Sequence, residues 1–464
     1  MIKLSLRKIA EILDGQLIGN DLFVENISTD TRISVEDGLF FALKGENFDA
    51  HNYLAQAIQQ GCTAIIVDHQ CDVNVPQIVV KDTRVALGKL AQWLRLTINP
   101  KTVAMTGSSG KTTVKEMTAA ILQEMVQDPS DVLFTSGNFN NDIGVPLTLL
   151  RLTEQHRFAV IELGANHIGE IAYTTDLTHP DVALVNNVAA AHLEGFGSIA
   201  GVAQAKGEIY LGLSENGVAI INLDCHYLEQ WKTSIASHKV RSFSLVNSQA
   251  DYYAENILLT VSGATFILNT PSGNVEIDLP YLGKHNISNA LAATALAMNV
   301  GATLQQVKQG LEKKSQVKGR LYPIQPCENL LLLDDTYNAN VDSLQSAISV
   351  LAGYKDSCRI LVVGDMAELG EKTKDCHQQV ASYTQQSDID IIISFGLESR
   401  VISAVKNGQH FEDKVDLLLE LINLVKSKLE NNQKVVVLAK GSRRMKMEDV
   451  IYSLEGAFNV SLVR

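Results

Sequence analysis

A short loop rich in glycine and hydroxyl side chains lies between a predicted strand at 102–106 and a predicted helix at 111–126. Such a loop turns backbone N–H groups and a helix N-terminus toward phosphate oxygens, its lysine neutralises the β and γ oxygens, and the hydroxyl after the lysine can hold Mg²⁺. Met105 stands where the full Walker pattern has its first glycine, so a plain glycine-containing turn is the alternative. The predicted phosphate-binding residues are Thr106, Gly107, Ser108, Ser109, Gly110, Lys111, Thr112 and Thr113.

This loop indicates ATP or GTP binding, and two missing tracts favour ATP. No Asp-x-x-Gly and no Asn-Lys-x-Asp occurs in the 464 residues, so the elements that read guanine and switch with it are missing. A nucleotide-gated binding protein without ATP chemistry remains an alternative.

Polar residues also follow the strands predicted at 158–163 and 181–188. In open α/β sheets, ligands bind beyond the carboxyl ends of the strands. Glu162 ends the first strand and is a candidate Mg²⁺ ligand. His192 follows the second strand, although a hydrogen-bonded loop histidine is the simpler interpretation of this residue alone.

Other polar residues have a structural explanation beside the functional one. Lys206 lies on a predicted helix, where a solvated lysine is the ordinary case. The cluster Asn138, Asn140 and Asn141 can be explained by turn formation.

Two later tracts are suited to reading a ribose or an adenine. The run 285–290 leads into an alanine-rich helix, with Asn289 expected near its N-terminus, and the run 334–340 follows a four-leucine strand. Helix capping by Asn340 or Asp342 is the alternative for the second tract.

Strands alternate with helices along the chain, which predicts an α/β protein with mostly parallel sheets. We expect three domains: a small α/β N-terminal domain at 1–99, a central P-loop ATPase-type parallel sheet at 100–318, and a Rossmann-like doubly wound C-terminal domain at 319–464. Asn99-Pro100 marks the first boundary. The segment 251–278 instead predicts antiparallel hairpins.

Composition narrows the function classes. The 39 Lys and Arg against 52 Asp and Glu give a net charge of −13, which argues against general binding to nucleic acids or anionic membranes. The six cysteines form no CxxC pair, which predicts reduced, buried thiols. We see no signal-peptide pattern and no membrane-spanning run, so a soluble cytoplasmic protein is expected.

Together these tracts resemble the Mur ligase family, the ATP-dependent amide ligases that build the peptidoglycan precursor. The family's phosphate loop is shorter than the Walker pattern, so Met105 is normal there. The resemblance covers nearly the whole chain through the runs GNFNNDIGVPLTLL (137–150), ELGANHIGEI (162–171), DDTYNANVDS (334–343), GDMAELG (364–370) and KGSR (440–443). These runs are most similar to those of the member that adds D-alanyl-D-alanine.

The resemblance implies a role for each matching residue. Lys111, His192 and Lys206 would be catalytic; two Mg²⁺ ions would be held by Thr112, Glu162, His192 and Lys206. Lys206 is similar to a lysine that is carbamylated in many members, which would make it an anionic ligand. The loop residues 106–113 would bind ATP together with Asn286, Asn289, Arg320, Asp335, Tyr337 and Asn338.

The resemblance also implies substrate tracts and domain roles. The N-terminal domain would bind a UDP-sugar, the central domain ATP, and the C-terminal domain would close over the ATP site. The implied substrate-binding residues are Ser28, Thr29, Asp30, Thr31, Arg32, Lys44, Gly45, Asn138, Asn140 and Asn141. Departures from the family pattern are Thr31 for serine, Ala50 for glycine and Val341 for proline, and none removes a group that the chemistry needs.

The implied activity joins D-alanyl-D-alanine to the terminal carboxylate of a UDP-N-acetylmuramoyl-tripeptide through an acyl phosphate, releasing ADP and phosphate. These small molecules would be the only partners of a monomer that binds neither nucleic acid nor membrane. Alternatives are a sibling ligase that adds a single amino acid, and folylpolyglutamate synthase. Siblings that add diaminopimelate carry Asn-Pro-Arg, which is missing here, and folylpolyglutamate synthase lacks the first hundred or so residues before the loop.

Overall fold

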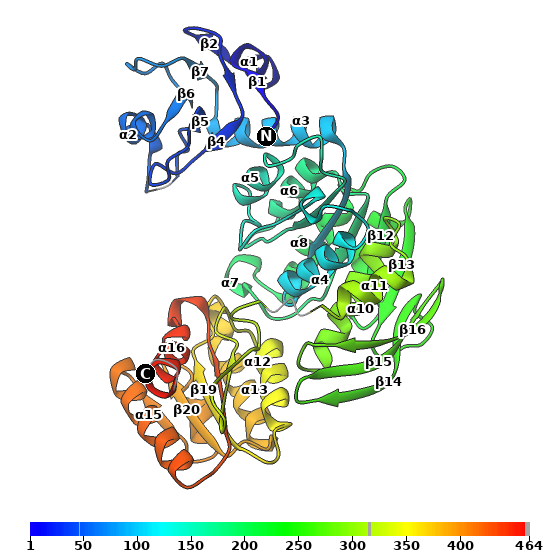
Figure 1. The fold of residues 1–464 in the computed structure, drawn as a ribbon, viewed down its shortest axis with the longest axis vertical. Helices are drawn as coiled ribbons and strands as arrows, with labels where there is room; N and C mark the ends of the chain where they lie inside the picture. The colour runs from blue at the N-terminus through cyan, green and yellow to red at the C-terminus, as the bar shows by residue number, and fades with distance from the viewer. Residues whose placement is uncertain (46, 314–316, 460–464) are drawn as a thin grey trace.

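The computed structural model describes residues 1–45, 47–313 and 317–459. Three blocks of the chain, each built on its own β-sheet or sheets, follow one another from top to bottom in Figure 1. The α/β fold class is confirmed, because each large sheet is mainly parallel and is covered by helices.

The first block contains a small mixed sheet. Its five strands have the order β2-β7-β6-β5-β4, parallel except for β2, and a separate pair joins β1 to β3. Its elements are β1 (Leu4–Ser5), α1 (Leu6–Leu13), β2 (Gln16–Ile18), β3 (Phe23–Val24), β4 (Asn26–Ser28), β5 (Gly38–Phe41), the 3-10 turn η1 (Ala50–Tyr53), α2 (Leu54–Gln59), β6 (Cys62–Val67), β7 (Gln77–Val79) and α3 (Thr83–Ile98).

The central block has a nine-stranded sheet in the order β16-β15-β14-β13-β12-β11-β8-β10-β9. Pairing is parallel from β9 to β14 and antiparallel through β15 and β16, which confirms the expected change to hairpins. The first half runs β8 (Lys101–Thr106), α4 (Lys111–Gln123), η2 (Pro129–Asp131), β9 (Val132–Phe134), α5 (Gly144–Leu149), β10 (Phe158–Glu162), α6 (Glu170–Thr178), β11 (Val182–Val185) and α7 (Leu193–Phe196). The second half runs α8 (Ile199–Gly207), η3 (Glu208–Tyr210), β12 (Val218–Asn222), α9 (Leu228–Ile235), β13 (Lys239–Ser244), β14 (Tyr252–Thr260), β15 (Gly263–Thr270), β16 (Gly273–Leu279), α10 (Lys284–Met298) and α11 (Leu304–Leu311).

The last block has a six-stranded sheet in the order β17-β18-β22-β19-β20-β21, parallel except for β17. Its elements are β17 (Tyr322–Cys327), β18 (Leu330–Asp334), α12 (Val341–Ala352), β19 (Cys358–Gly364), η4 (Gly370–Lys372), α13 (Thr373–Gln386), β20 (Ile391–Phe395), α14 (Arg400–Ala404), β21 (Gln409–Phe411), α15 (Lys414–Glu430), β22 (Val435–Lys440), η5 (Arg443–Met445) and α16 (Glu448–Phe458). The strands β18, β19 and β22 are apolar runs, as expected for a sheet covered on both faces.

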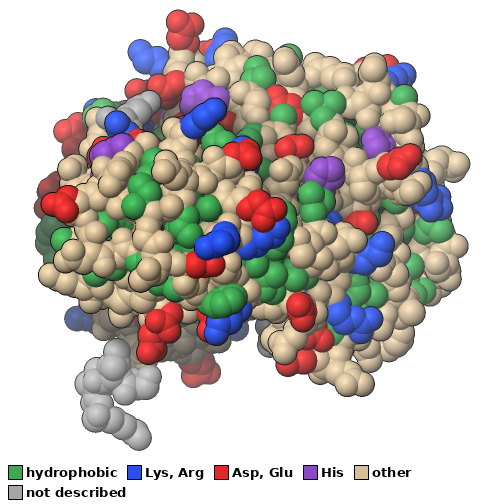
Figure 2. Space-filling view, turned by 90° about the horizontal axis from the view of Figure 1, so that it is seen from above, with side chains coloured by type: hydrophobic (Ala, Val, Ile, Leu, Met, Phe, Trp, Pro, Cys, Tyr) green, Lys and Arg blue, Asp and Glu red, His purple; other side chains and the backbone are tan. Residues whose placement is uncertain are grey.

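The surface carries charges of both signs. Figure 2 shows acidic and basic side chains interspersed over the face seen from above, without a broad patch of one sign. All six cysteines are free; Cys62 and Cys376 are buried, whereas the other four are only half-buried. Across the described residues, no helix combines the length and apolar character needed to cross a membrane.

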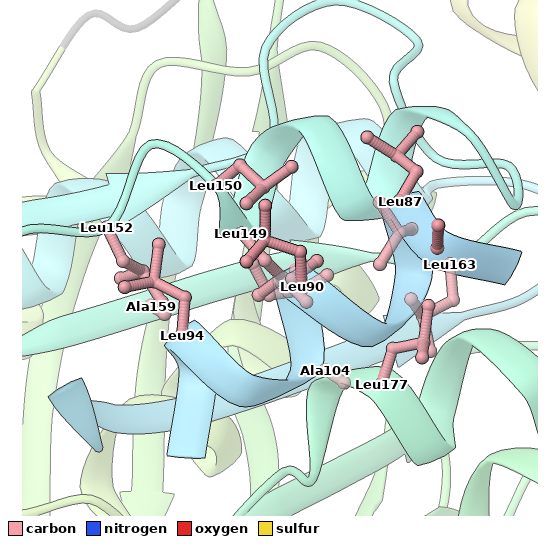
Figure 3. Close-up of a cluster of buried hydrophobic side chains, with 14 of the residues drawn as sticks. Leu87, Leu90, Leu94, Ala104, Leu149, Leu150, Leu152, Ala159, Leu163 and Leu177 are labelled. Atoms are coloured by element: carbon pink, nitrogen blue, oxygen red, sulfur yellow. The ribbon is translucent and has the colours of Figure 1, made fainter. Parts of the chain in front are cut away.

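Helix α3 joins the first block to the central one. Its leucines Leu87, Leu90 and Leu94 are fully buried and point into a cluster with Leu149 of α5 (Figure 3). The same cluster continues under the central sheet through Ala104 of β8. Burying a leucine side chain stabilises a fold by about 2 kcal/mol, so this shared core fixes α3 against the sheet that carries the phosphate loop.

Candidate active site

The phosphate loop leaves β8 and enters α4, as its spacing predicts. Gly107 and Gly110 have φ values of +153° and +77°, a backbone region that favours glycine. Lys111 is the first residue of α4, and its Nζ donates to the Gly107 carbonyl at 2.7 Å. Burial lowers the pKa of Lys111, and the negative charge of Glu162 opposes that shift. The loop therefore presents a cation and a helix N-terminus to an anionic ligand.

Two asparagines that follow β11 hold this loop in place. The side-chain oxygen of Asn187 accepts the Ser109 N–H at 2.9 Å, and Nδ2 of Asn186 donates to the Ser109 carbonyl at 3.0 Å. Both backbone groups of Ser109 are therefore fixed by side chains from the neighbouring strand end.

These hydrogen bonds behind the phosphate loop form a brace that continues into α10. Asn186 Nδ2 also donates to Asn289 Oδ1 at 3.0 Å, and Asn289 Nδ2 donates to Asn286 Oδ1 at 2.9 Å. Asn289 lies in the N-terminal half of α10, as expected, but the helix already begins at Lys284, which places Asn289 about one turn after Asn286. A Cβ on Gly110 would lie 2.4 Å from Asn289 Oδ1, so the brace requires glycine there.

Glu162 ends β10 with its side chain almost fully buried. Its Oε1 accepts from Asn140 Nδ2 at 2.8 Å, and its backbone N–H donates to the Thr135 hydroxyl at 2.9 Å. Its Oε2 is also buried but has no hydrogen-bond partner among the residues that the structure describes. A buried carboxylate oxygen without a partner is costly, and a cation would satisfy it.

His192 immediately precedes α7, with a positive φ of 53°. Its Nδ1 forms an ion-pair contact with the carboxylate of Glu368, which lies between β19 and η4 in the last block. The Glu194 N–H also donates to the Glu368 carbonyl at 3.2 Å. Burial lowers the pKa of His192, and Glu368 opposes that shift.

Lys206 lies in the last turn of α8 and is 1% exposed, which overturns the ordinary expectation of a solvated lysine. Its Nζ lies 5.7 Å from the centroid of the Phe196 ring. No carboxylate within the described ranges forms an ion pair with it. Burial, and then the charge of Lys111, lower the pKa of Lys206 well below its usual range.

The last block contributes a second set of polar groups. The Arg320 guanidinium lies 4.3 Å from the centroid of the Tyr337 ring. Asp335 links two segments, because one carboxylate oxygen accepts the Leu321 N–H at 3.2 Å while the other pairs with Lys440 at 2.7 Å. Lys440 Nζ also donates to the Asn338 carbonyl at 2.9 Å. The residues that begin the last block, around Leu321, are thus fixed to its sheet by hydrogen bonds and an ion pair.

Twelve of the predicted site residues meet in one cleft of about 220 Å³. It is lined by Ser108, Ser109, Gly110, Lys111, Asn138, Asn140, Asn141, Glu162, His192, Arg320, Tyr337 and Asn338, among others. A second cleft, which shares Ser109, Gly110 and Arg320 with the first, is lined by Thr113, Asn286, Asn289 and Asp335 as well. Lys206 is buried and lines neither.

The predicted uridine tracts lie elsewhere. None of the described residues at 28–32, 44 or 45 lines either cleft. Arg32 pairs with Asp30 at 2.7 Å, which lowers the pKa of that carboxyl to about 2, and Lys44 lies 3.9 Å from Asp49. Their role in ligand binding stays a prediction.

Four residues of the site were missed by the sequence reasoning. Asn186 and Asn187 lie near the end of the strand predicted at 181–188, just as Glu162 lies near the end of the strand predicted at 158–163. Glu368 and Lys440 lie in tracts that carried the family resemblance but had no role assigned to them. Their contacts depend on how the last block meets the central one, which no local pattern encodes.

Comparisons with known proteins agree with this geometry. The family descriptions "Mur ligase middle domain" and "Mur ligase, glutamate ligase domain" match residues 105–297 and 319–443. The UDP-N-acetylmuramoyl-tripeptide–D-alanyl-D-alanine ligase of Haemophilus influenzae is 62% identical over 457 residues, covering 98% of this chain and 99% of that protein.

Solved structures are similar over the same length. MurF from Acinetobacter baumannii superposes with a TM-score of 0.91 at 36% identity, covering 98% of this chain and 99% of the other. The MurF ligase from Thermotoga maritima, in complex with ADP, gives a TM-score of 0.82 at 26% identity and covers 94% and 98%.

Proposed function

The chain belongs to the Mur ligase family, and from this premise we propose how its cleft joins D-alanyl-D-alanine to the tripeptide of UDP-N-acetylmuramoyl-tripeptide with consumption of ATP. The product is the UDP-linked pentapeptide used in peptidoglycan synthesis, with release of ADP and phosphate. The observation that carries the proposal is the meeting of the phosphate loop, Glu162 and His192 with Arg320 and Tyr337 of the last block in one cleft.

We assign the first cleft to the reacting groups and the second to the nucleoside of ATP. Lys111 Nζ donates back to the loop at Gly107, and side chains hold both backbone groups of Ser109, so the loop would hold a γ-phosphoryl group in a fixed position. Arg320 and Tyr337 approach the same place from the last block. Phosphoryl transfer depends mostly on positioning and charge, which these groups provide.

The residues present fit Mg²⁺. Glu162 offers a buried oxygen without a partner, Thr112 follows the loop lysine, and His192 lines the same cleft. Carboxylate and hydroxyl oxygens suit this ion, and when bound it supplies positive charge to the phosphate oxygens. We propose Thr112 and Glu162 for one ion and His192 with Lys206 for a second.

Lys206 is suited to carbamylation. Burial without an anionic partner favours the neutral form of the amine, and only the neutral amine can attack CO₂. The amine loses a proton as it takes up CO₂, and the resulting carbamate carries a negative charge that could bind a metal ion.

In the proposed reaction, the tripeptide carboxylate attacks the γ-phosphorus of ATP and ADP leaves. The amine of D-alanyl-D-alanine then attacks the acyl carbon of the acyl phosphate, and phosphate leaves. The last block closes the cleft against water, which would otherwise hydrolyse the acyl phosphate. We place the UDP group on the tracts 28–32 and 44–45 of the first block, with domain limits at 99 and 318.

We further propose that the chain acts as a monomer in the cytoplasm, where its nucleotide substrates are made.

The test is phosphate release from ATP with Mg²⁺, UDP-N-acetylmuramoyl-tripeptide and D-alanyl-D-alanine, omitting each component in turn. We expect release only with both co-substrates, together with a pentapeptide product by mass spectrometry, and none from Lys111→Ala. Release with a single amino acid as acceptor would assign the chain to a sibling activity. Nucleotide binding without phosphate release under any combination would indicate a nucleotide-binding protein without ligase activity.

A further inference from the structure

A second cluster of metal-ligating side chains lies in the first block, away from the clefts. His51 belongs to η1, whereas Asp68 and His69 directly follow β6. One ligand atom from each of these three residues lies within 4.8 Å of the others. The His51 Nε2 lies 3.2 Å from Asp68 Oδ1, and the His69 Nδ1 lies 2.5 Å from the same oxygen.

His51 is oriented by a second carboxylate. Its side chain is only 6% exposed, and its Nδ1 hydrogen-bonds Asp49 Oδ1 at 2.6 Å. An Nδ1–H that donates to a carboxylate leaves the lone pair of Nε2 directed at Asp68, the arrangement by which proteins orient metal-bound imidazoles. This lone pair lies 3.2 Å from Asp68 Oδ1, so one metal ion could bind both atoms.

We propose that His51, Asp68 and His69 bind a divalent transition-metal ion of the Zn²⁺ class, which fastens η1 to the end of β6. Two imidazoles and one carboxylate suit Zn²⁺, Ni²⁺ or Cu²⁺ rather than Mg²⁺. Tetrahedral zinc with bonds of about 2.1 Å separates its ligand atoms by about 3.4 Å, which lies between the 2.5 Å and 4.8 Å found here. Three protein ligands leave a fourth position for water.

Binding would replace two existing hydrogen bonds, one at His51 Nε2 and the 2.5 Å contact between His69 Nδ1 and Asp68 Oδ1. The Asp68 backbone N–H donates to His51 Nε2 at 3.2 Å, and a metal ion would replace it there. The net stabilisation from such a bond is about 1 kcal/mol, which is small beside the affinity of zinc for imidazole. The same turn carries Asp49, which pairs with Lys44 of the predicted uridine tract.

The test is a Zn²⁺ titration of the full, chelator-treated chain against a chromophoric zinc chelator, together with the thermal unfolding midpoint. The variant is His69→Gln, because that side chain is 65% exposed and its loss should leave the fold intact. The matched control is His167→Gln, an equally exposed histidine that also contacts a carboxylate, that of Glu170 at 3.1 Å.

We expect one zinc equivalent in the wild type and in His167→Gln, and at least a tenfold weaker affinity in His69→Gln. Zinc should raise the unfolding midpoint of the first two proteins and not that of the third. Equal affinities in all three proteins, or no zinc uptake by the wild type, would show a protonated ion cluster and overturn the proposal.

Discussion

The carboxylate of Glu368 contacts Nδ1 of His192 across the boundary between the last and the central blocks. Its backbone carbonyl accepts the Glu194 N–H in the same place, so the tract 364–370 touches the segment that begins α7 through two contacts. The orientation of the His192 side chain therefore depends on the position of the last block. A carboxylate on Nδ1 leaves Nε2 as the atom that can face a metal ion.

Glu368→Gln tests this link. Removing the carboxylate that orients a metal-bound histidine typically weakens metal affinity by 10–100-fold. We expect the Mg²⁺ concentration for half-maximal ligation to rise by about tenfold, with a smaller change at saturating Mg²⁺. Glu371→Gln, an exposed change in the adjacent 3-10 turn, is the control. An unchanged Mg²⁺ dependence would separate Glu368 from the metal site.

Gly110→Ala tests the brace behind the phosphate loop. The new methyl group would meet Asn289 Oδ1 at 2.4 Å and Asn186 Nδ2 at 2.6 Å, at a φ of +77°. We expect the free energy of unfolding to fall by about 2 kcal/mol and ATP binding to weaken at least tenfold. Gly456→Ala, whose Cβ would meet nothing within 4 Å in helix α16, should leave ATP binding unchanged and should not lower the free energy of unfolding. Wild-type ATP affinity in Gly110→Ala would contradict the assigned role.

Lys206→Arg tests carbamylation. Arginine is of similar length but stays protonated when buried, so it cannot take up CO₂. We expect ligase activity to fall by at least 100-fold, and a carbamate signal from ¹³C-labelled bicarbonate to be present in the wild type and lost in the variant. Wild-type activity should also fall in CO₂-free buffer and recover with bicarbonate. Full activity without bicarbonate would contradict carbamylation.

Structural features that are determined by a short stretch of sequence could be predicted, whereas features that depend on contacts between distant segments could not. The phosphate loop is a contiguous motif between two strongly patterned elements, so its place and its lysine could be predicted. Strand β13 (Lys239–Ser244) was not predicted, because only two of its six residues are buried and its apolar pattern is weak. The start of α10 was expected close to the alanine-rich run, but the helix already begins at Lys284. It follows Gly283, whose φ of +88° is not helical.

The burial of Lys206 could not be predicted from its neighbours. Nothing in Ala-Lys-Gly-Glu distinguishes a buried lysine from a solvated one; the burial results from the packing of α8 against distant segments. The contact between Glu368 and His192 likewise joins residues 176 positions apart and depends on the placement of a whole block. The family resemblance supplied these tracts, but only the structure shows which atoms meet.

The final prediction concerns His285, which lines the second cleft. Burial, and then the charge of Lys440, lower the pKa of His285 to about 4 from its ordinary 6.5. Between pH 4 and pH 6.5 His285 is protonated in the unfolded chain but neutral in the folded chain. Its contribution to the free energy of unfolding is therefore complete above pH 6.5 and is lost as the pH falls toward 4. The full difference corresponds to about 3 kcal/mol, and because the ring is only half-buried we expect about half of it.

The measurement is the urea-derived free energy of unfolding at several pH values between 4 and 7, for the wild type and His285→Gln. Asp342 in the same cleft acts in the opposite direction, because burial raises the pKa of its carboxyl and favours the folded form at low pH. Comparing the two proteins cancels that contribution, since both retain Asp342. We expect the wild type to lose about 1.5 kcal/mol more than the variant between pH 6.5 and 4. Parallel curves would mean that the folded protein protonates His285 as readily as the unfolded chain does.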